Sequence, residues 1–422
     1  MVSTLAAWAL LAGGLLGLVF TVHGFLPSRR EPLLVVSFAA SLLTLELAAH
    51  HLAWQIASAG VLVALGALSE TAGRVGLAVS AVSSAGLALM LIEASRARGT
   101  MREALSGFGR AAEAPRIPAS HLLFPFPLHR DGVRRTRDVV YAQYPGRRVK
   151  LDVYEPAAPG RGRLALVQVH GGAWVVGDKR EQGIPLCLHA AAHGWVAFNV
   201  NYRLSPGATF PEHLIDLKRA IAWIREHAED HGVDPSFLAV TGGSAGGHLT
   251  ALLALTAGDL RYQPGFEEAD TSVQAAVPFY GVYDFTNRSG AFPPVFVRRL
   301  LEAHVMKAFL AEEPEKFRDA SPLDRVRADA PPFLVIHGGR DTLAPIGDAR
   351  AFVGRLREVS RSAVLYAEIR GAQHAFDVFA TPRSAPVIEG VVGFLDEARR
   401  RHLAGDARSE GPGRASRAGG GA

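Results

Sequence analysis

Past the middle of the chain stands TGGSAGGHL, Thr241 to Leu249, in which four glycines surround one serine. Glycines gather where a chain needs positive φ or where another group approaches its backbone, so phosphate-binding loops and nucleophile turns are both candidates. Neither the dinucleotide-loop spacing nor the P-loop spacing fits these residues. The pattern that fits is G-x-S-x-G, with Ser244 at its centre.

The residues on either side of this turn predict a strand and a helix. Phe237 to Val240 is a short apolar run, and Leu249 to Leu255 is apolar all round apart from Thr250, as in a buried helix. Strand, tight turn and buried helix form the context of a nucleophile elbow, in which Gly242 and Gly246 let strand and helix close without Cβ collisions. We therefore interpret Ser244 as a nucleophile.

From Val149 onward, short β-branched runs alternate with longer amphipathic stretches, which predicts βα units and a mostly parallel sheet. An insertion, 285–322, interrupts this alternation and holds a helical stretch that we expect to form a cap. The expected strands are Val149–Tyr154 (an edge strand), Leu164–Val169, Trp195–Val200, Phe237–Val240, Val273–Phe279, Phe333–His337 and Ala363–Ile369, and the expected helices include Pro211–Ala228, Val295–Leu310 and Val387–Arg399.

Length and composition divide the chain of 422 residues into more than one unit. The first 93 residues are strongly apolar with few charges, whereas the rest has the mixed composition of a soluble domain. The predicted order is a transmembrane helical region, a linker, an α/β domain, and a disordered tail rich in Gly, Arg and Ser. The boundaries are 1–93, 94–135, 136–402 and 403–422.

Three apolar stretches lie in the first region. Leu5–Leu26 holds no acidic or basic residue and is long enough to span a bilayer; without a basic segment before it, a cleaved signal peptide is the weaker interpretation. Leu33–Leu68 would be about 54 Å long as one helix, so it is either one kinked or tilted span with an interfacial extension, or two short spans. Val75–Ile92 is the last stretch.

Basic residues favour three spans over four. One cluster follows the first span and a second follows the last. With three spans both clusters lie on the same side, which the positive-inside rule assigns to the cytoplasm, together with the α/β domain. We therefore expect a multi-pass protein of the cell membrane. The clusters are Arg29 and Arg30, then Arg96, Arg98, Arg102 and Arg110.

Glu46, His50 and His51 are ionisable residues inside the second apolar stretch, at helical spacing. They suggest either a metal or proton site within the membrane or a helix end near the interface. We favour the second interpretation. Cys187 is the single cysteine, so no intrachain disulfide forms, and the scattered arginines behind the pI of about 9.5 do not predict nucleic-acid binding.

A serine hydroxyl needs a base, and this motif predicts an acid and a histidine downstream in the order Ser, Asp, His. Asp341 follows the strand run in FLVIHGGRD, and His374 follows the run in AVLYAEIRGAQH, each past the carboxyl end of a strand. Asp377 and Asp284 are the rival carboxylates. We prefer Asp341, because Asp377 is expected to cap the next helix and Asp284 ends an earlier strand run.

A tetrahedral intermediate requires donors for its oxyanion. HGGAW, His170 to Trp174, places glycines after an early strand and exposes backbone amides. We assign the oxyanion hole to the backbone N–H groups of Gly171, Gly172 and Ala245.

These blocks resemble the hormone-sensitive-lipase-like α/β-hydrolases, and within them the bacterial branch of acetyl and feruloyl esterases that carry GGSAGGHL. The resemblance covers Val149 to Leu395 and departs from the family at Ala173, where many members have glycine, and at Gly243, where many have aspartate. The matching blocks are HGGAWVVGDKR, NYRLSPGATFPEHLIDLKRAIAWIREHA, GVDPSFLAVTGGSAGGHL, HGGRDTLAP and GAQHAFD.

The resemblance implies an α/β-hydrolase fold and a serine carboxylic ester hydrolase that works through an acyl-enzyme on lipid-derived or small apolar esters. A thioesterase or an aminopeptidase with the same triad is the alternative, and a non-catalytic membrane receptor with this fold is a third. The expected partners are an ester substrate and the membrane, without nucleic acid. No metal or cofactor is implied.

Overall fold

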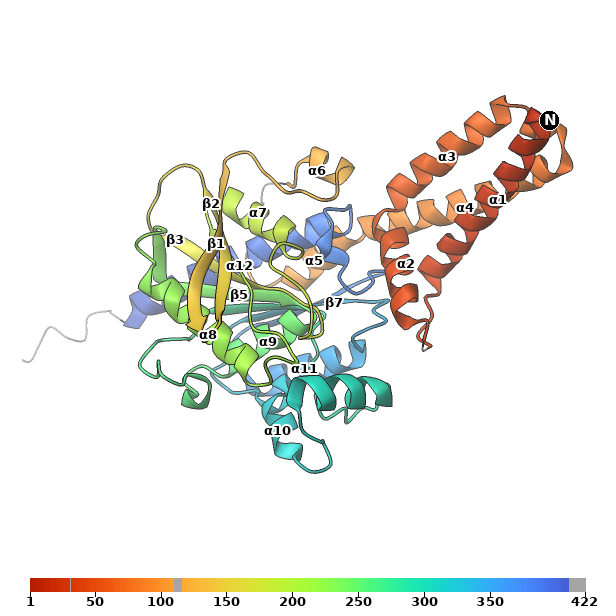
Figure 1. Cartoon of the computed structure of the whole chain (residues 1–422). Coiled ribbons are helices and arrows are strands. Elements are labelled where there is room, and N and C mark those ends of the chain that lie inside the picture. The colour runs from red at the N-terminus through yellow and green to blue at the C-terminus, as the bar shows by residue number, and fades with distance from the viewer. Residues whose placement is uncertain (31, 110–115, 410–422) are drawn as a thin grey trace, which may run out of the picture.

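The computed structural model describes residues 1–30, 32–109 and 116–409 (Figure 1). Its centre is an eight-stranded sheet in the order β1-β2-β4-β3-β5-β6-β7-β8. β1 pairs antiparallel with β2 and β2 antiparallel with β4, while all other pairs are parallel. The predicted fold class is thereby confirmed. The strands are β1 (Val133–Tyr144), β2 (Arg147–Pro156), β3 (Arg163–Val169), β4 (Val196–Val200), β5 (Val233–Gly243), β6 (Ala275–Phe279), β7 (Phe333–Gly338) and β8 (Val364–Ile369).

Helices cover both faces of the sheet, which explains why its inner strands are apolar on both sides. Along β3, Val167 packs into the cluster formed with one set of helices and Leu166 into the cluster formed with the other. The first set is α8 (Glu212–Glu226), α9 (Ala245–Leu255) and α11 (Ile346–Val359); the second is α5 (Ala97–Leu105), α7 (Ile184–Ala192) and α12 (Ser384–Ser409).

The segment between β6 and β7, which includes the predicted cap, holds a π-helix, η3 (Phe296–Met306). Leu301 and Met306 are buried against the same core cluster as α8 and α9. The same segment holds the short helices α10 (Pro314–Asp319) and η4 (Pro322–Asp324). Other short helices are η1 (Ala67–Ser69), η2 (Leu260–Tyr262) and η5 (Phe376–Val378).

Two boundaries predicted from the sequence, the end of the linker and the start of the tail, differ from those in the structure. The predicted linker reaches residue 135, yet it contains α5, α6 (Ala119–Leu123) and the start of β1, which makes β1 rather than the strand at 149–154 the edge of the sheet. β1 was missed because most of its residues are exposed or half-exposed and carry no apolar alternation. α12 continues to Ser409, so the first part of the predicted tail is helical, and residues 410–422 lie outside the described residues.

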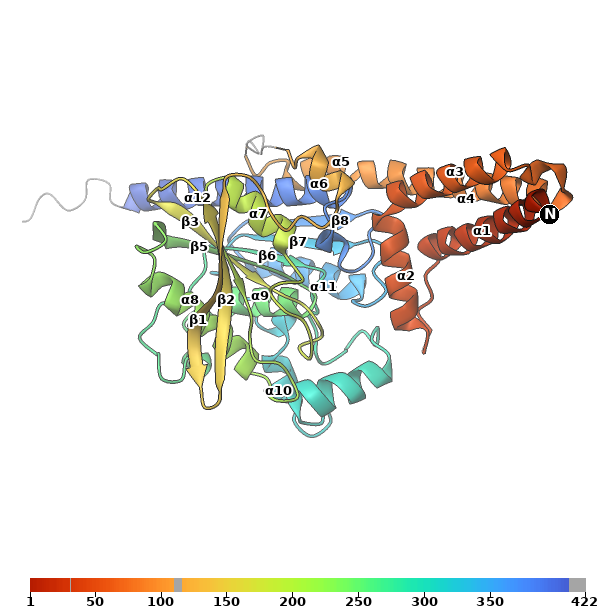
Figure 2. The same cartoon turned by 45° about the horizontal axis from the view of Figure 1, so that its top comes forward.

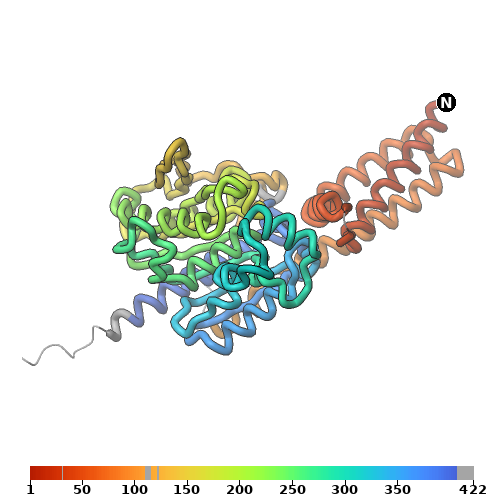
Figure 3. Tube along the Cα trace, turned by 60° about the horizontal axis from the view of Figure 1, so that its bottom comes forward, coloured from red at the N-terminus to blue at the C-terminus, as the bar shows by residue number. Residues whose placement is uncertain are grey.

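The described part of the first 95 residues, 1–30 and 32–95, holds four α-helices and the short η1. α1 (Val2–Phe25), α3 (Ala48–Ala64) and α4 (Thr71–Ser95) run side by side away from the sheet, whereas α2 (Leu34–Glu46) lies across the end of this bundle nearest the sheet (Figures 2 and 3). α1 and the helix Thr71–Leu105 are long and apolar enough to cross a membrane, and α2 with α3 would make a third span, bent by 78°. Glu46 ends α2, and His50 and His51 lie in the first turn of α3, so these residues mark a helix break.

A buried ion pair joins α2 to the α/β domain. Glu46 Oε1 lies 2.8 Å from Nε of Arg383, and both side chains are fully shielded from solvent. The Thr381 hydroxyl donates a second hydrogen bond of 2.9 Å to Glu46 Oε2. Because a buried charge that loses its partner is costly, this pair ties the position of α2 to the start of α12.

We expect Glu46→Gln to lower the stability of the folded chain by roughly 3–5 kcal/mol, because the Arg383 guanidinium would stay buried without a counter-charge. The measurement is thermal unfolding of the detergent-purified protein. Glu70→Gln is the control: Glu70 is exposed and only accepts a 3.3 Å bond from Thr4, so its effect should stay within about 0.5 kcal/mol. Equal unfolding midpoints for the two variants would contradict the assigned role of Glu46.

Candidate active site

Ser244 sits on a sharp turn between β5 and α9. Its backbone has φ 59° and ψ −120°, a conformation that L-residues rarely adopt. The Ser244 N–H donates a 3.0 Å hydrogen bond to the carbonyl of Phe279, at the end of the neighbouring strand β6. The turn is therefore held from the side, and the serine follows directly on the carboxyl end of a central strand.

The glycines around Ser244 are required by close backbone contacts. A Cβ at Gly242 would lie 2.5 Å from the Val169 carbonyl oxygen, and one at Gly246 would lie 2.2 Å from the same atom. A Cβ at Gly243 would lie 2.6 Å from the Tyr280 hydroxyl oxygen. The space that a side chain before the nucleophile would use is thus filled by Tyr280, which gives a physical reason for glycine at position 243.

The HGGAW loop follows β3 and faces the elbow. Gly172 has φ 114°, and a Cβ there would lie 2.0 Å from the Val176 carbonyl oxygen, so no other residue fits. Ala173 and Trp174 also have positive φ, 53° and 62°. This run of left-handed residues turns the loop sharply after the strand.

The three predicted oxyanion donors differ in their surroundings. Ala245 is the first residue of α9, so its N–H has no acceptor inside the helix. The Gly171 N–H donates a 2.7 Å hydrogen bond to Oε1 of Gln182. Gly171 is close to the nucleophile, since a Cβ on it would lie 3.0 Å from the Ser244 Cβ. Its amide becomes available to a ligand only if the Gln182 side chain moves.

Trp174 and His248 tie the HGGAW loop to α9. The buried indole N–H of Trp174 donates to Nδ1 of His248 at 3.2 Å, and His248 Nε2 bonds the Ala320 carbonyl at 2.7 Å. Burial lowers the pKa of His248 to about 3, which keeps its ring neutral. This histidine therefore supports the packing of the loop.

Asp341 follows β7 and is buried. Its Oδ1 accepts hydrogen bonds of 2.8 Å from the N–H groups of Leu343 and Ala344, and its Oδ2 lies 2.7 Å from Nδ1 of His374. Burial disfavours the carboxylate, but His374, His337 and the Ala344 N–H together outweigh burial, so the pKa of Asp341 is lowered. The side chain is held as an anion that fixes one nitrogen of the imidazole.

Gln373 links the two loops that carry Asp341 and His374. Its Oε1 accepts from the N–H of Thr342 at 2.8 Å and from the N–H of His374 at 2.9 Å. The His374 ring itself packs against Tyr280, with ring centroids 4.6 Å apart. Since Tyr280 follows Phe279, which binds the Ser244 N–H, His374 and Ser244 lie at the same end of the sheet.

The rival carboxylates lie in different environments. Asp377 accepts a hydrogen bond from the Tyr280 hydroxyl, and burial raises its pKa, the opposite direction to Asp341. Asp284 accepts bonds from the N–H groups of Thr286 and Arg288 and pairs with the Arg288 guanidinium at 3.0 Å. Of the three carboxylates, Asp341 is the one hydrogen-bonded to the His374 ring.

The N-terminal helices reach the same loops. Arg29, between α1 and α2, donates to the Asp341 carbonyl at 3.0 Å, and Gln373 Nε2 donates to the Ser41 hydroxyl at 3.3 Å. Glu93 of α4 pairs with Arg340 at 2.7 Å, directly before Asp341. No pattern in the sequence signals these contacts, because their partners lie more than 240 residues apart.

Comparison with known proteins places this chain among esterases. The family model described as BD-FAE matches residues 151–356, from β2 into α11. The chain is 49% identical over 270 residues to the probable carboxylic ester hydrolase LipM of Mycobacterium tuberculosis, covering 64% of this chain and 62% of LipM. It is 45% identical over 274 residues to the esterase LipC of the same organism, covering 64% and 67%. The match thus spans less than two thirds of LipM.

Among solved structures, the butyrate-bound thermophilic esterase Est2 of Thermogutta terrifontis is similar, with a TM-score of 0.52 and 26% identity. The similarity covers 94% of Est2 but 65% of this chain. About a third of this chain therefore has no counterpart in that match.

Proposed function

The chain belongs to the hormone-sensitive-lipase-like esterases of the α/β-hydrolase fold, and we therefore propose that it hydrolyses carboxylic esters through an acyl-enzyme formed on Ser244. The observation that carries this proposal is the hydrogen bond of 2.7 Å between Asp341 and His374, on two loops beside the elbow of Ser244. An imidazole oriented by a carboxylate, at the same end of the sheet as a strained serine, is the arrangement that we expect to activate the hydroxyl nucleophile.

In the first half of the reaction, Ser244 Oγ attacks the carbonyl carbon of the ester while His374 Nε2 takes the hydroxyl proton. Asp341 holds the opposite ring nitrogen and stabilises the imidazolium that forms. The tetrahedral intermediate collapses when the alcohol leaves with the proton from His374. The acyl group remains bonded to Ser244.

In the second half, His374 removes a proton from water, and the hydroxide oxygen attacks the acyl carbon. The carboxylic acid leaves and Ser244 regains its proton. In both halves the negative oxygen would be bound by the N–H groups of Gly172 and Ala245, and by that of Gly171 after displacement of Gln182. The Gly172 and Ala245 amides are held by the left-handed loop and by the first turn of α9, so these two need little reorganisation.

We further propose that the protein is a multi-pass membrane protein with three spans and a cytoplasmic catalytic domain. The positions of the two basic clusters support this. Arg29 contacts the Asp341 carbonyl, and Arg98 pairs with Glu389 of α12 at 2.9 Å. Both clusters therefore meet the α/β domain at the same end of the bundle, while Arg110 lies outside the described residues. A site beside the bilayer suits lipid-derived or small apolar esters.

We expect Ser244→Ala to reduce hydrolysis of p-nitrophenyl acyl esters by about 10⁶-fold, because the nucleophile is lost. Ser236→Ala is the matched control, since Ser236 lies in the same strand but is exposed and bonds only to Asp234. A fluorophosphonate probe should label the wild type and Ser236→Ala but not Ser244→Ala. Turnover that persists unchanged in Ser244→Ala would contradict the proposal.

Asp341→Asn and Asp377→Asn separate the two buried carboxylates near His374. The first should lower kcat by about 10⁴-fold, because an amide cannot stabilise the imidazolium or hold the correct tautomer. The second should change kcat by less than about tenfold, since Asp377 bonds to Tyr280 and not to the imidazole. Equal losses in the two variants would mean that the assignment of Asp341 is wrong.

A further inference from the structure

Phe38, on the membrane-side helix α2, touches the histidine of the candidate site. Its ring meets the His374 ring edge-on, with centroids 6.0 Å apart and planes at 74°. The Phe38 side chain is only half-buried, although it lies beside a histidine that is 5% exposed. Part of an aromatic surface is therefore left open next to the imidazole.

The position of Phe38 is fixed from several sides. Ser41, one turn later on α2, bonds to Gln373, and Arg29 before the helix bonds to the Asp341 carbonyl. Glu46 at the end of α2 is anchored by its buried pair with Arg383. These contacts fix the backbone that carries Phe38, so its ring forms a wall at a defined place beside the imidazole.

The chemistry of the proposed reaction determines which part of a substrate meets this wall. His374 must approach the leaving oxygen within hydrogen-bond distance in order to protonate it. The group attached to that oxygen, the alcohol part of the ester, then lies beside whatever covers the imidazole. The acyl carbon is instead placed by Ser244 and the oxyanion donors.

We propose that Phe38 is a specificity-determining residue that contacts the apolar alcohol part of the ester, so that the N-terminal helices supply one wall of the substrate site. This rests on the proposed ester hydrolysis. The favoured substrates are esters of extended apolar alcohols. In this proposal the N-terminal helices select the substrate as well as holding the enzyme at the bilayer.

The test varies the alcohol and the acyl group separately in the full-length, detergent-purified protein. Octyl acetate and ethyl acetate form the same acetyl-enzyme, so a difference in kcat/KM between them reports only the alcohol. Phe38→Ala should reduce the octyl-to-ethyl ratio of kcat/KM about tenfold or more, and Phe38→Leu should reduce it less. A series of ethyl esters with graded acyl chains should keep its profile.

Val36→Ala is the control, because Val36 lies on the same helix but is 70% exposed. Titration with a fluorophosphonate counts the competent sites and corrects for any misfolded fraction. An unchanged octyl-to-ethyl ratio in both Phe38 variants, or an equal change in the acyl series, would overturn the role of Phe38. A wild type that neither hydrolyses esters nor reacts at Ser244 would instead overturn the proposed function.

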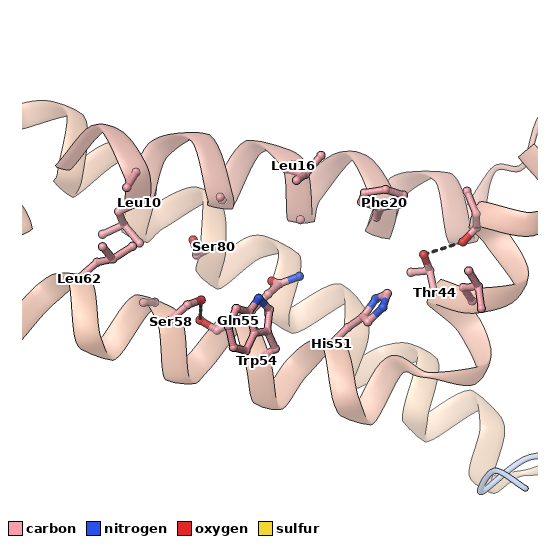
Figure 4. A pocket seen from close by; sticks show the side chains of 17 residues that line it. Leu10, Leu16, Phe20, Thr44, His51, Trp54, Gln55, Ser58, Leu62 and Ser80 are labelled. Carbon is pink, nitrogen blue, oxygen red and sulfur yellow. Dashed lines mark hydrogen bonds between the residues drawn. The ribbon is translucent and has the colours of Figure 1, made fainter. Parts of the chain in front are cut away.

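A cavity of about 360 Å³ inside the bundle supports a second and independent inference (Figure 4). It lies between α1 and α3, with Ser80 of α4 at its back, and small residues such as Gly13 and Gly17 leave room on the α1 side. Its helices are long and apolar enough to span a membrane if α2 and α3 count as one bent span. In a bilayer, hydrocarbon chains would surround the bundle that holds this cavity.

Polar groups inside this cavity indicate more than a gap filled by any lipid tail. Gln55 projects between the two helices, and its Oε1 is buried without a hydrogen-bond partner among the described residues. His51 and Ser58 lie on the same side of α3. A buried amide oxygen without a hydrogen-bond partner is costly in an apolar environment. We therefore expect the molecule that fills the cavity to have an apolar chain and a hydrogen-bonding group.

We infer that this cavity binds a single-chain lipid that carries a hydroxyl group, with the chain along α1 and the hydroxyl at Gln55, whose side chain rotates to present its buried Oε1 to the cavity. Gly13→Leu tests this directly, because a Cβ at Gly13 meets nothing within 4 Å and a leucine there would fill the cavity without a clash. Gly60→Leu is the matched control: Gly60 has equal space but lies on α3 outside the cavity lining.

The probe is a long-chain alcohol with a photoactivatable diazirine, added to the purified protein. The wild type and Gly60→Leu should be labelled on α1 or α3, and Gly13→Leu should be labelled at least about fivefold less. Gln55→Leu should abolish the preference for the alcohol over the corresponding diazirine alkane. Equal labelling of Gly13→Leu and Gly60→Leu, or no preference for the alcohol in the wild type, would overturn the inference.

Discussion

Ser244 has a left-handed backbone conformation between a central strand and a buried helix, and this conformation sets the geometry of the site. The turn brings the backbone of the elbow so close to the Val169 carbonyl that Gly242 and Gly246 cannot carry a side chain. The Phe279 carbonyl then holds the Ser244 N–H, and the first amide of α9 is left facing away from the helix. The rest of the site is arranged around this strained serine.

Much of the arrangement was predictable because it follows from local rules. Elbow glycines and apolar strand runs are patterns within short stretches, and the strands from β2 to β8 lie close to where those patterns place them. The sequence did not predict β1, because an exposed antiparallel strand has little hydrophobic alternation. The hydrogen bonds of Gln182 and Gln373 were not predicted for a different reason. They form between separate loops, and spacing in the sequence does not show which loops lie together.

The contact between α2 and the α/β domain is a second example of an arrangement that spacing in the sequence does not predict. Glu46 was recognised as an unusual charge in an apolar stretch, but its partner Arg383 lies 337 residues further along the chain. Once the pair is known, the helix break at Leu47 gains a physical reason: α2 must turn across the end of the bundle to place its carboxylate against the domain. The sequence therefore indicated that a helix ends near Glu46, but it did not indicate that Glu46 pairs with Arg383.

Polar contacts fix the orientation of α2 on the α/β domain. An apolar helix face can slide or rotate with little loss, whereas a buried carboxylate must meet its guanidinium or pay a large desolvation cost. Glu46 and Ser41 of α2 bond to the connection between β8 and α12, and Arg29 just before α2 bonds to the loop after β7, so one orientation of α2 satisfies all three contacts. That orientation places Phe38 on His374, so the same contacts that attach the membrane helices also define the surface beside the imidazole.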